Sequence, residues 1–259
     1  MAGAKIDTYR FLRSVTLVRE LVPSFAAYPF SIPAIERLQT LKLHPKVTFL
    51  IGENGSGKST LIEAIAVAAG FNAEGGSKNF RFATRASHSE LYKSLRLARG
   101  IKRERDGFFL RAESYFNLAT NIEELDREGG GPSIMAAYSD VSLHEQSHGE
   151  SFLALATRRL RGNGLYIFDE PEAALSPTRQ LTLLKVIDEL VQKKSSQFVI
   201  ATHSPILMAY PDSDIYSLSS KGIKAVRYED TEHYQVTRDF LVNRERFFKH
   251  LFAPDGDDE

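Results

Sequence analysis

The sequence predicts an α/β fold with a mostly parallel central sheet, and three buried strands joined by helices are the basis of this prediction. Three largely apolar segments are typical of strands that are covered on both faces: Val47 to Ile51, Leu165 to Phe168 and Gln197 to Thr202. Pro177 opens a helix between the last two, with apolar residues at helical spacing, Leu183, Ile187, Leu190 and Val191. A strand, a helix and a strand in this order form the crossover unit of a parallel sheet. We therefore expect these strands to be parallel.

Weaker patterns indicate the remaining elements. Residues 9–22 and the proline-punctuated residues 23–33 indicate an antiparallel β portion with turns, and Leu61 to Ala69 indicates a helix. The C-terminal part has short strands at 215–218 and 223–228, an amphipathic helix around 237–252 and an acidic, disordered end at 255–259. We expect one domain over residues 1–259, in which residues 72–145 form an inserted helical or variable region.

The composition narrows the class of protein. With 259 residues, 42% hydrophobic and 25% charged, the chain is long enough for one large core. The formal net charge of +0 gives no overall argument for nucleic acid or a membrane surface. The absence of cysteine excludes disulfides and thiolate metal sites and agrees with a cytoplasmic location. The apolar stretch from Ala64 to Ala69 is far shorter than the roughly 20 residues that span a bilayer.

A glycine-rich loop lies between the first buried strand and the first helix. Its glycines let successive backbone N–H groups point at a phosphate, and the helix adds its positive N-terminal end. Lys58 is placed to bridge the β- and γ-phosphates of ATP, and the Ser59 hydroxyl is placed to ligate Mg²⁺. The strand, loop and helix order is the context that this motif requires. We assign ATP binding to Gly52, Glu53, Asn54, Gly55, Ser56, Gly57, Lys58, Ser59 and Thr60.

Two adjacent carboxylates follow the second buried strand. Alternate residues of an extended chain point in opposite directions, so Asp169 and Glu170 take separate roles. We assign Asp169 to Mg²⁺ and Glu170 to polarising the attacking water. Together with the glycine loop, these acids predict an ATPase that hydrolyses the γ-phosphate.

The two motifs and two further segments resemble the ATP-binding-cassette (ABC) class of P-loop ATPases in order and spacing. Gln146-Ser147-His148-Gly149-Glu150 stands where the class has its Leu-Ser-Gly-Gly-Gln signature, although its His and the final Glu depart from the commonest residues. Ala173 to Ser176 resembles the D-loop, and Ala201 to Ser204 supplies the switch histidine, His203. The chain looks most like small stand-alone ATPases of the AAA/ABC type, related to the head domains of the repair and overcoming-lysogenization families.

The resemblance implies that an inserted helical region carries the signature and that two chains share each site. In the class, the signature of one subunit completes the phosphate site of the other, so the resemblance implies a head-to-tail homodimer enclosing two ATP molecules. It also implies that His203 contacts the γ-phosphate and helps to hold the attacking water. Independently, Ser147 and Gly149 lie just before an apolar-periodic segment, Phe152 to Leu160. Ser147 is therefore either the cap of a second anion site or a plain helix cap without a ligand.

Two features of the class have no clear match. No glutamine lies between the phosphate loop and Gln146, so the γ-phosphate-sensing glutamine is missing. Glu113, at the end of the strand-like segment Phe108 to Ser114, is the candidate replacement. Tyr28 and Phe30 are candidates to stack on adenine, but each is equally typical of a core residue.

The segment from Lys78 to Arg105 is rich in Lys and Arg, which predicts either a nucleic-acid contact or a solvated helix face. The leading function is a cytoplasmic ATPase whose ATP-driven dimerisation acts on a nucleic acid or protein partner. DNA maintenance or defence is what the resemblance implies. Two alternatives stay open: the ATPase subunit of a membrane ABC transporter, whose membrane part would be another chain, and a nucleotide-gated binding module with negligible turnover.

Overall fold

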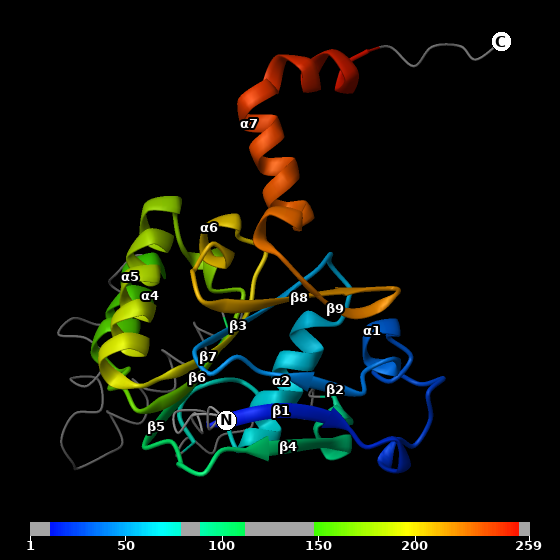
Figure 1. The fold of residues 1–259 in the computed structure, drawn as a ribbon, viewed down its shortest axis with the longest axis vertical. Helices are drawn as coiled ribbons and strands as arrows, with labels where there is room; N and C mark the ends of the chain where they lie inside the picture. The colour runs from blue at the N-terminus through cyan, green and yellow to red at the C-terminus, as the bar shows by residue number, and fades with distance from the viewer. Residues whose placement is uncertain (1–10, 79–88, 112–147, 254–259) are drawn as a thin grey trace, which may run out of the picture.

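The computed structural model describes residues 11–78, 89–111 and 148–253, and its centre is a six-stranded sheet (Figure 1). In spatial order the strands are β5 (Asp106–Arg111), β6 (Gly164–Asp169), β7 (Gln197–Ala201), β3 (Val47–Ile51), β8 (Ser213–Ser219) and β9 (Gly222–Val226). Neighbouring strands from β5 to β8 are parallel, and β9 is antiparallel to β8 at the edge. The predicted α/β fold with a mostly parallel sheet is confirmed.

The three strands predicted from their apolar patterns lie side by side in the middle of this sheet. Every residue of β3, β6 and β7 is buried, as expected for strands covered on both faces. Helix α5 (Pro177–Lys194) connects β6 to β7, and Asp169 is in register with Ala201. Because β3, β6 and β7 are parallel, their C-terminal ends lie at one edge of the sheet.

Helices cover the sheet on both faces. Alternate residues of β6 divide between two cores: Tyr166 and Phe168 face one, and Leu165 and Ile167 face the other. The first core is closed by α4 (His148–Arg158) and α5, and the second by α2 (Lys58–Ala69). Figure 1 shows α4 and α5 together on one side and α2 on the other. Two short helices, α1 (Pro33–Glu36) and α6 (Pro205–Met208), complete these layers.

A second, antiparallel sheet packs beside α2. Its order is β2-β1-β4, with β1 (Leu12–Leu17) between β2 (Thr40–Lys42) and β4 (Leu95–Arg99). The predicted N-terminal antiparallel portion is therefore present, with β4 added from later in the chain. The helix α2 contacts β4, so this sheet covers the outer side of α2.

The described part of the predicted insert contains strands. The sequence predicts a helical or variable insert over residues 72–145, and its described residues include the 3-10 helix η2 (Glu90–Ser94) and the strands β4 and β5. The solvated helix face considered for Lys78 to Arg105 is wrong where β4 stands. Leu95 and Leu97 pack toward the core while Arg96 points to solvent, so the side chains alternate with the period of a strand.

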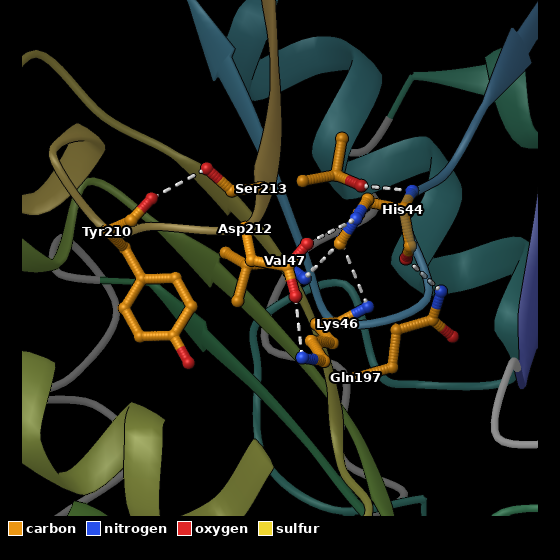
Figure 2. A network of polar contacts seen from close by, with 8 residues as sticks. His44, Lys46, Val47, Gln197, Tyr210, Asp212 and Ser213 are labelled. Atoms are coloured by element: carbon orange, nitrogen blue, oxygen red, sulfur yellow. Dashed lines mark hydrogen bonds and ion pairs between the residues drawn. The ribbon is translucent and has the colours of Figure 1, made fainter. Parts of the chain in front are cut away.

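Gln197 joins the two sheets at the edge of the parallel sheet opposite the C-terminal strand ends. Its buried side-chain oxygen accepts from the backbone N–H groups of Phe11 and Leu12, at 3.0 and 2.8 Å. Its amide nitrogen donates to the carbonyl oxygens of Leu12 and His44, at 2.7 and 2.9 Å. Figure 2 shows this amide beside His44 and the Lys46–Asp212 ion pair, in which Nζ and Oδ2 are 2.6 Å apart. The Gln197 amide therefore holds the two sheets together at this edge, and both of its polar atoms are hydrogen-bonded.

The last helix, α7 (Glu232–Leu251), confirms the predicted C-terminal helix and extends away from the body (Figure 1). No residue of α7 is buried, and it is kinked at Asn243, where φ is −126° and ψ is 37°. The 3-10 helices η1 (Arg19–Leu21), η4 (Pro171–Ala174) and η5 (Tyr228–Asp230) complete the described elements. Among the residues described, no helix is both long enough and apolar enough to cross a membrane.

Candidate functional site

The glycine loop connects β3 to α2 in a conformation that only glycines adopt easily. Gly52, Gly55 and Gly57 have φ values of 148°, 79° and 97°. Space is limiting as well, since a Cβ on Gly52 would lie 2.4 Å from the carbonyl oxygen of Leu218. A Cβ on Gly57 would lie 2.9 Å from Ile32 Cγ2. The loop therefore curls against its neighbours as the phosphate-binding motif requires, with Glu53 and Asn54 exposed at its tip.

Lys58 places a buried cation inside this curl. Its side-chain Nζ donates to the carbonyl oxygens of Gly52 at 2.8 Å and Glu53 at 3.1 Å, and the residue is 4% exposed. Burial lowers the pKa of Lys58, while the negative charges of Glu170 and Asp169 oppose that shift. The loop thus holds a poorly hydrated cation, which favours binding an anion.

Ser59 and Asp169, the two residues predicted to hold a metal, are in direct contact. Ser59 Oγ donates to Asp169 Oδ1 at 3.1 Å, and Asp169 is 5% exposed at the end of β6. Arg111 Nε lies 3.6 Å from the other carboxylate oxygen, and Arg111 Nη1 donates to Glu63 Oε2 at 2.6 Å. In the described part of the chain, no group of three or more His, Cys, Asp or Glu side chains has the arrangement of a metal site. A hydroxyl and a carboxylate oxygen are the donors that Mg²⁺ uses when phosphates and water supply its other ligands.

Glu170 has an unusual backbone that separates it from Asp169. Its φ of 50° is left-handed, which is uncommon for a residue other than glycine. Its backbone N–H donates to the carbonyl oxygen of Ala201 at 2.9 Å, which fixes the turn after β6 to the end of β7. The carboxylate Oε1 lies 3.4 Å from His203 Nε2. Glu170 therefore points at the predicted switch histidine rather than at Ser59.

His203 follows β7 and is held on three sides. Its backbone N–H donates to Glu172 Oε1 at 2.5 Å, its Nε2 faces Glu170, and its Nδ1 lies 3.1 Å from His233 Nε2. Burial lowers the pKa of His203, and the nearby cation of Lys58 lowers it further. Burial raises the pKa of Glu172.

The sequence analysis did not single out Glu172 or His233. Glu172 lies two residues after Glu170, so a search for further acids behind the carboxylate pair would have found it. His233 comes from the first turn of α7, thirty residues after His203, and no spacing in the sequence marks it. Tertiary packing alone brings it to the site.

Two cavities lie beside the glycine loop. One of about 570 Å³ is lined by the loop residues 52–56, by residues 217–220 at the end of β8 and by residues 230–233 around the start of α7. The other, of about 510 Å³, is lined by Glu53, Asn54, His203, His233 and further residues of the first turns of α7. The start of α7 therefore forms one wall of the space next to the phosphate loop.

The signature region lies on the other side of the molecule from α2. Ser147 and the rest of the signature before His148 lie outside the described residues. Gly149 is buried in the first turn of α4, where a Cβ would lie 2.8 Å from the carbonyl oxygen of Ala174 and 2.5 Å from Arg179 Nη1. Arg179 Nη2 also donates to Glu150 Oε1 at 3.0 Å. The start of α4 is thus packed against η4, whose last two residues begin the segment that resembles the D-loop.

The structure separates the two adenine-stacking candidates. Tyr28 is 68% exposed, and its hydroxyl lies 3.3 Å from Thr60 Oγ1 in the first turn of α2. Phe30 is 2% exposed and packs in the core with α2. Only Tyr28 presents a free ring face beside the phosphate loop. Glu113, the candidate replacement for the sensing glutamine, lies outside the described residues.

The basic region is partly neutralised within the chain. Lys78 and Arg99 both pair with the buried side chain of Glu104, and Lys93 pairs with Glu90. Arg99 also donates to the carbonyl oxygen of Ala69 at 3.0 Å. A further group of basic residues in this region is exposed: Arg96, Arg103 and Arg105. Part of the positive charge therefore holds the fold together, and part faces solvent.

Two family models match the chain. An AAA-domain model matches residues 25–104, which include the glycine loop. A second AAA-domain model, whose description refers to the AbiEii toxin of a Type IV TA system, matches residues 137–209, which include β6 and His203. No curated protein matches the chain.

Several solved structures align with the chain at low sequence identity. A metal-chelate type ABC transporter in an inward-facing conformation aligns with a TM-score of 0.50 at 15% identity, over 88% of each chain. The protein cbiO1 from Clostridium perfringens, part of the ABC transporter complex cbiONQ, aligns with a TM-score of 0.47 at 16% identity, over 93% of this chain and 98% of that one. The SMC head domain from Thermotoga maritima aligns with a TM-score of 0.46 at 17% identity, over 84% of this chain and 99% of that one.

Proposed function

We propose that this chain, an ATPase of the ABC/AAA P-loop class by its two family matches and its fold, hydrolyses ATP with Mg²⁺ in a head-to-tail homodimer. The observation that carries the proposal is the meeting of five groups at one edge of the sheet. Lys58 lies inside the glycine loop, Ser59 contacts Asp169, and Glu170 contacts His203. These groups lie at or just after the ends of three separate strands, so the fold brings them together.

In this proposal the residues divide into those that bind and those that assist the reaction. The loop from Gly52 to Thr60 binds the phosphates through its backbone N–H groups and Lys58. Ser59 and Asp169 would hold Mg²⁺, which would supply charge neutralisation for the phosphates. The contact between Ser59 Oγ and Asp169 Oδ1 at 3.1 Å brings the two donors together at one point. Tyr28 stacks on the adenine.

Glu170 and His203 act on the reacting atoms. Glu170 accepts a hydrogen bond from a water and directs its oxygen at the γ-phosphorus. A new oxygen–phosphorus bond forms as the bond to the β-phosphate oxygen breaks, giving ADP and inorganic phosphate. His203 donates to an oxygen of the transferred group, where negative charge must be stabilised. The 3.4 Å separation of His203 Nε2 and Glu170 Oε1 lets both groups reach one γ-phosphate and its water.

The position of α4, whose start carries part of the proposed second anion site, supports the proposed homodimer. The start of α4 packs with α5 on one face of the sheet, whereas α2 begins at the phosphate loop on the other face. Ser147 and Gly149 are proposed to complete the phosphate site of a second copy, as the resemblance to the ABC class implies. A head-to-tail pair with two-fold symmetry would form two such sites.

Glu170→Gln tests the proposal most simply. The variant keeps the shape of the side chain but removes the carboxylate that polarises water, so single-turnover hydrolysis should fall about 100-fold or more. ATP binding should persist, and ATP should convert the variant to a dimer in light scattering. Glu189→Gln, an exposed position on α5, is the matched control and should behave like the parent chain. Undiminished hydrolysis in Glu170→Gln would refute the assignment, and a persistent monomer at high concentration would refute the dimer.

The partner of the dimer is proposed to be a nucleic acid, bound in part by Arg96, Arg103 and Arg105. These side chains are exposed on the described part of the basic region, where Lys78 and Arg99 are engaged with Glu104. DNA maintenance or defence would fit such a partner, and the second family match refers to a toxin of a Type IV TA system.

Nucleic-acid retention by the ATP-locked Glu170→Gln variant tests this partner. Retention should occur at low salt and weaken steeply as salt rises, because phosphate contacts release counterions. Replacing the three exposed arginines with glutamine should reduce both the retention and its salt dependence. Absence of retention at low salt would favour a protein partner, and co-purification with a membrane protein would favour the transporter alternative.

A further inference from the structure

His233 of α7 contacts the predicted switch histidine directly. Its Nε2 lies 3.1 Å from His203 Nδ1, and the two ring centroids are 5.2 Å apart. The other ring nitrogen of His203, Nε2, lies 3.4 Å from Glu170 Oε1. His203 therefore has a second histidine on one side and the carboxylate of the reaction centre on the other.

Hydrogen bonds fix the first turn of α7 in this position. The buried Thr231 caps the helix by accepting from the N–H of Tyr234 at 3.4 Å, and its hydroxyl donates to the carbonyl oxygen of Tyr228 at 2.7 Å. The Tyr228 hydroxyl donates to the carbonyl oxygen of Pro205 at 3.0 Å. Pro205 lies two residues after His203, so these bonds tie the start of α7 to the segment that carries the switch histidine. None of the residues of α7 itself is buried.

The contacts favour one arrangement of protons on the two rings. A hydrogen bond between two neutral imidazoles needs an N–H on one ring and a lone pair on the other. If His203 donated from Nδ1, its Nε2 would turn a lone pair toward the Glu170 carboxylate, which is repulsive. If His233 donates from Nε2, His203 keeps its proton on Nε2 and turns an N–H toward Glu170. The hydrogen bond at His203 Nδ1 thus determines whether His203 Nε2 carries a proton.

The surroundings keep both rings in the neutral form that this argument needs. Burial and the cation of Lys58 lower the pKa of His203, against the opposing effect of Glu170. Burial lowers the pKa of His233, with Glu232 opposing the shift and Lys58 adding to it. Glu53 opposes the shift at His233, and Glu172 accepts from the His203 backbone. Near neutral pH, neither ring carries a charge that would override the choice of tautomer.

We propose that His233 is a positioning residue for ATP hydrolysis, which donates from Nε2 to His203 Nδ1 and so keeps the His203 proton on Nε2, facing the γ-phosphate. The proposal rests on the proposed function, in which His203 contacts the γ-phosphate. A fixed N–H at that point costs no reorganisation when charge develops on the transferred group. His233 acts only through His203 and contacts no reacting atom.

A pair of variants separates the hydrogen bond from the bulk of the side chain. His233→Phe keeps an aromatic ring of similar size but cannot donate, whereas His233→Gln retains an amide N–H at a comparable reach. His233→Phe should lower kcat about tenfold, which corresponds to about 1.4 kcal/mol, with KM for ATP changed by less than about twofold. His233→Gln should recover most of the lost kcat. Gln235→Ala, at an exposed position on the same helix, is the control for effects on α7 itself.

The tautomer itself is visible in the NMR spectrum of the full chain labelled with ¹⁵N-histidine. His203 should show its proton on Nε2 in the parent chain and in His233→Gln, and a mixture of tautomers in His233→Phe. An unchanged kcat in His233→Phe, or a kcat in His233→Gln as low as in His233→Phe, would overturn the proposal. A parent His203 protonated on Nδ1 would overturn it as well. The proposed function fails separately, through undiminished hydrolysis in Glu170→Gln or through a persistent monomer of that variant in the presence of ATP.

Discussion

The phosphate loop and the start of α4 are both helix N-termini, but among the described residues only the first is surrounded by the groups proposed to be catalytic. At the loop, Lys58 is buried, Ser59 contacts Asp169, and Glu170 and His203 lie at the adjacent strand ends. At α4, Gly149 packs on η4, and the helix belongs to the core on the other face of the sheet. One half of the site is therefore assembled by the sheet, and the other is held away from it. Such a division is expected of a site that a second copy completes.

The largest effect should come from Lys58→Ala, which removes the cation from the phosphate-loop half of the site, here called the assembled half. The loss of a charge-assisted contact to phosphate should weaken ATP binding about 100-fold, or about 3 kcal/mol. Calorimetric titration of ATP with Mg²⁺ measures the change, with Lys185→Ala on the exposed side of α5 as the control. Unchanged affinity would show that the phosphates bind somewhere other than this loop.

Gly149→Val should damage the other half while leaving ATP binding to the loop intact. The valine side chain has to displace the carbonyl of Ala174 or the side chain of Arg179. Its Cβ alone would lie 2.8 Å from that carbonyl oxygen and 2.5 Å from Arg179 Nη1. Displacing a positioning element by about 1 Å can cost about 100-fold in rate, so we expect kcat to fall between about tenfold and 100-fold. Arg179→Gln separates the effect of the arginine from that of the helix start. A parallel loss of ATP affinity in Gly149→Val would mean that the two halves are not separate.

Tyr28→Ala should have the smallest effect and should act only on the assembled half. Loss of the exposed ring beside Thr60 should raise KM for ATP about fivefold, as expected for one aromatic stacking contact of about 1 kcal/mol. Tyr28→Phe keeps the ring and removes only the hydroxyl contact with Thr60, so its KM should stay within about twofold. Steady-state kinetics with ATP and GTP would show a weaker preference for ATP in Tyr28→Ala alone. Equal values for both variants would exclude Tyr28 from the base site.

The sequence predicts the assembled half well because its signals are local. A fully buried strand such as β3 has a continuous apolar pattern, and the glycines that follow it are required by left-handed backbone and close contacts. Asp169 ends β6 and Glu170 follows it, as expected. These features depend on residues that are close together in the sequence, so the sequence alone predicts them.

The features that the sequence did not predict depend on packing between distant segments. The strand β4 has the sequence Leu-Arg-Leu-Ala-Arg, which resembles a basic helix face until its pairing with β1 is known. Tyr28 and Phe30 are only two residues apart, and burial alone distinguishes them. His233 reaches His203 because Thr231 and Tyr228 hold α7 beside it. No local pattern carries that information.

The most direct test of the shared site mixes two impaired chains, Lys58→Ala and Gly149→Val. In a mixed dimer, the intact loop of the second chain would meet the intact α4 of the first, so one of the two sites would be whole. With random pairing, ATPase activity should recover to about a quarter of the parent value, well above either variant alone. Activity equal to the average of the separate variants would contradict a site built from two chains.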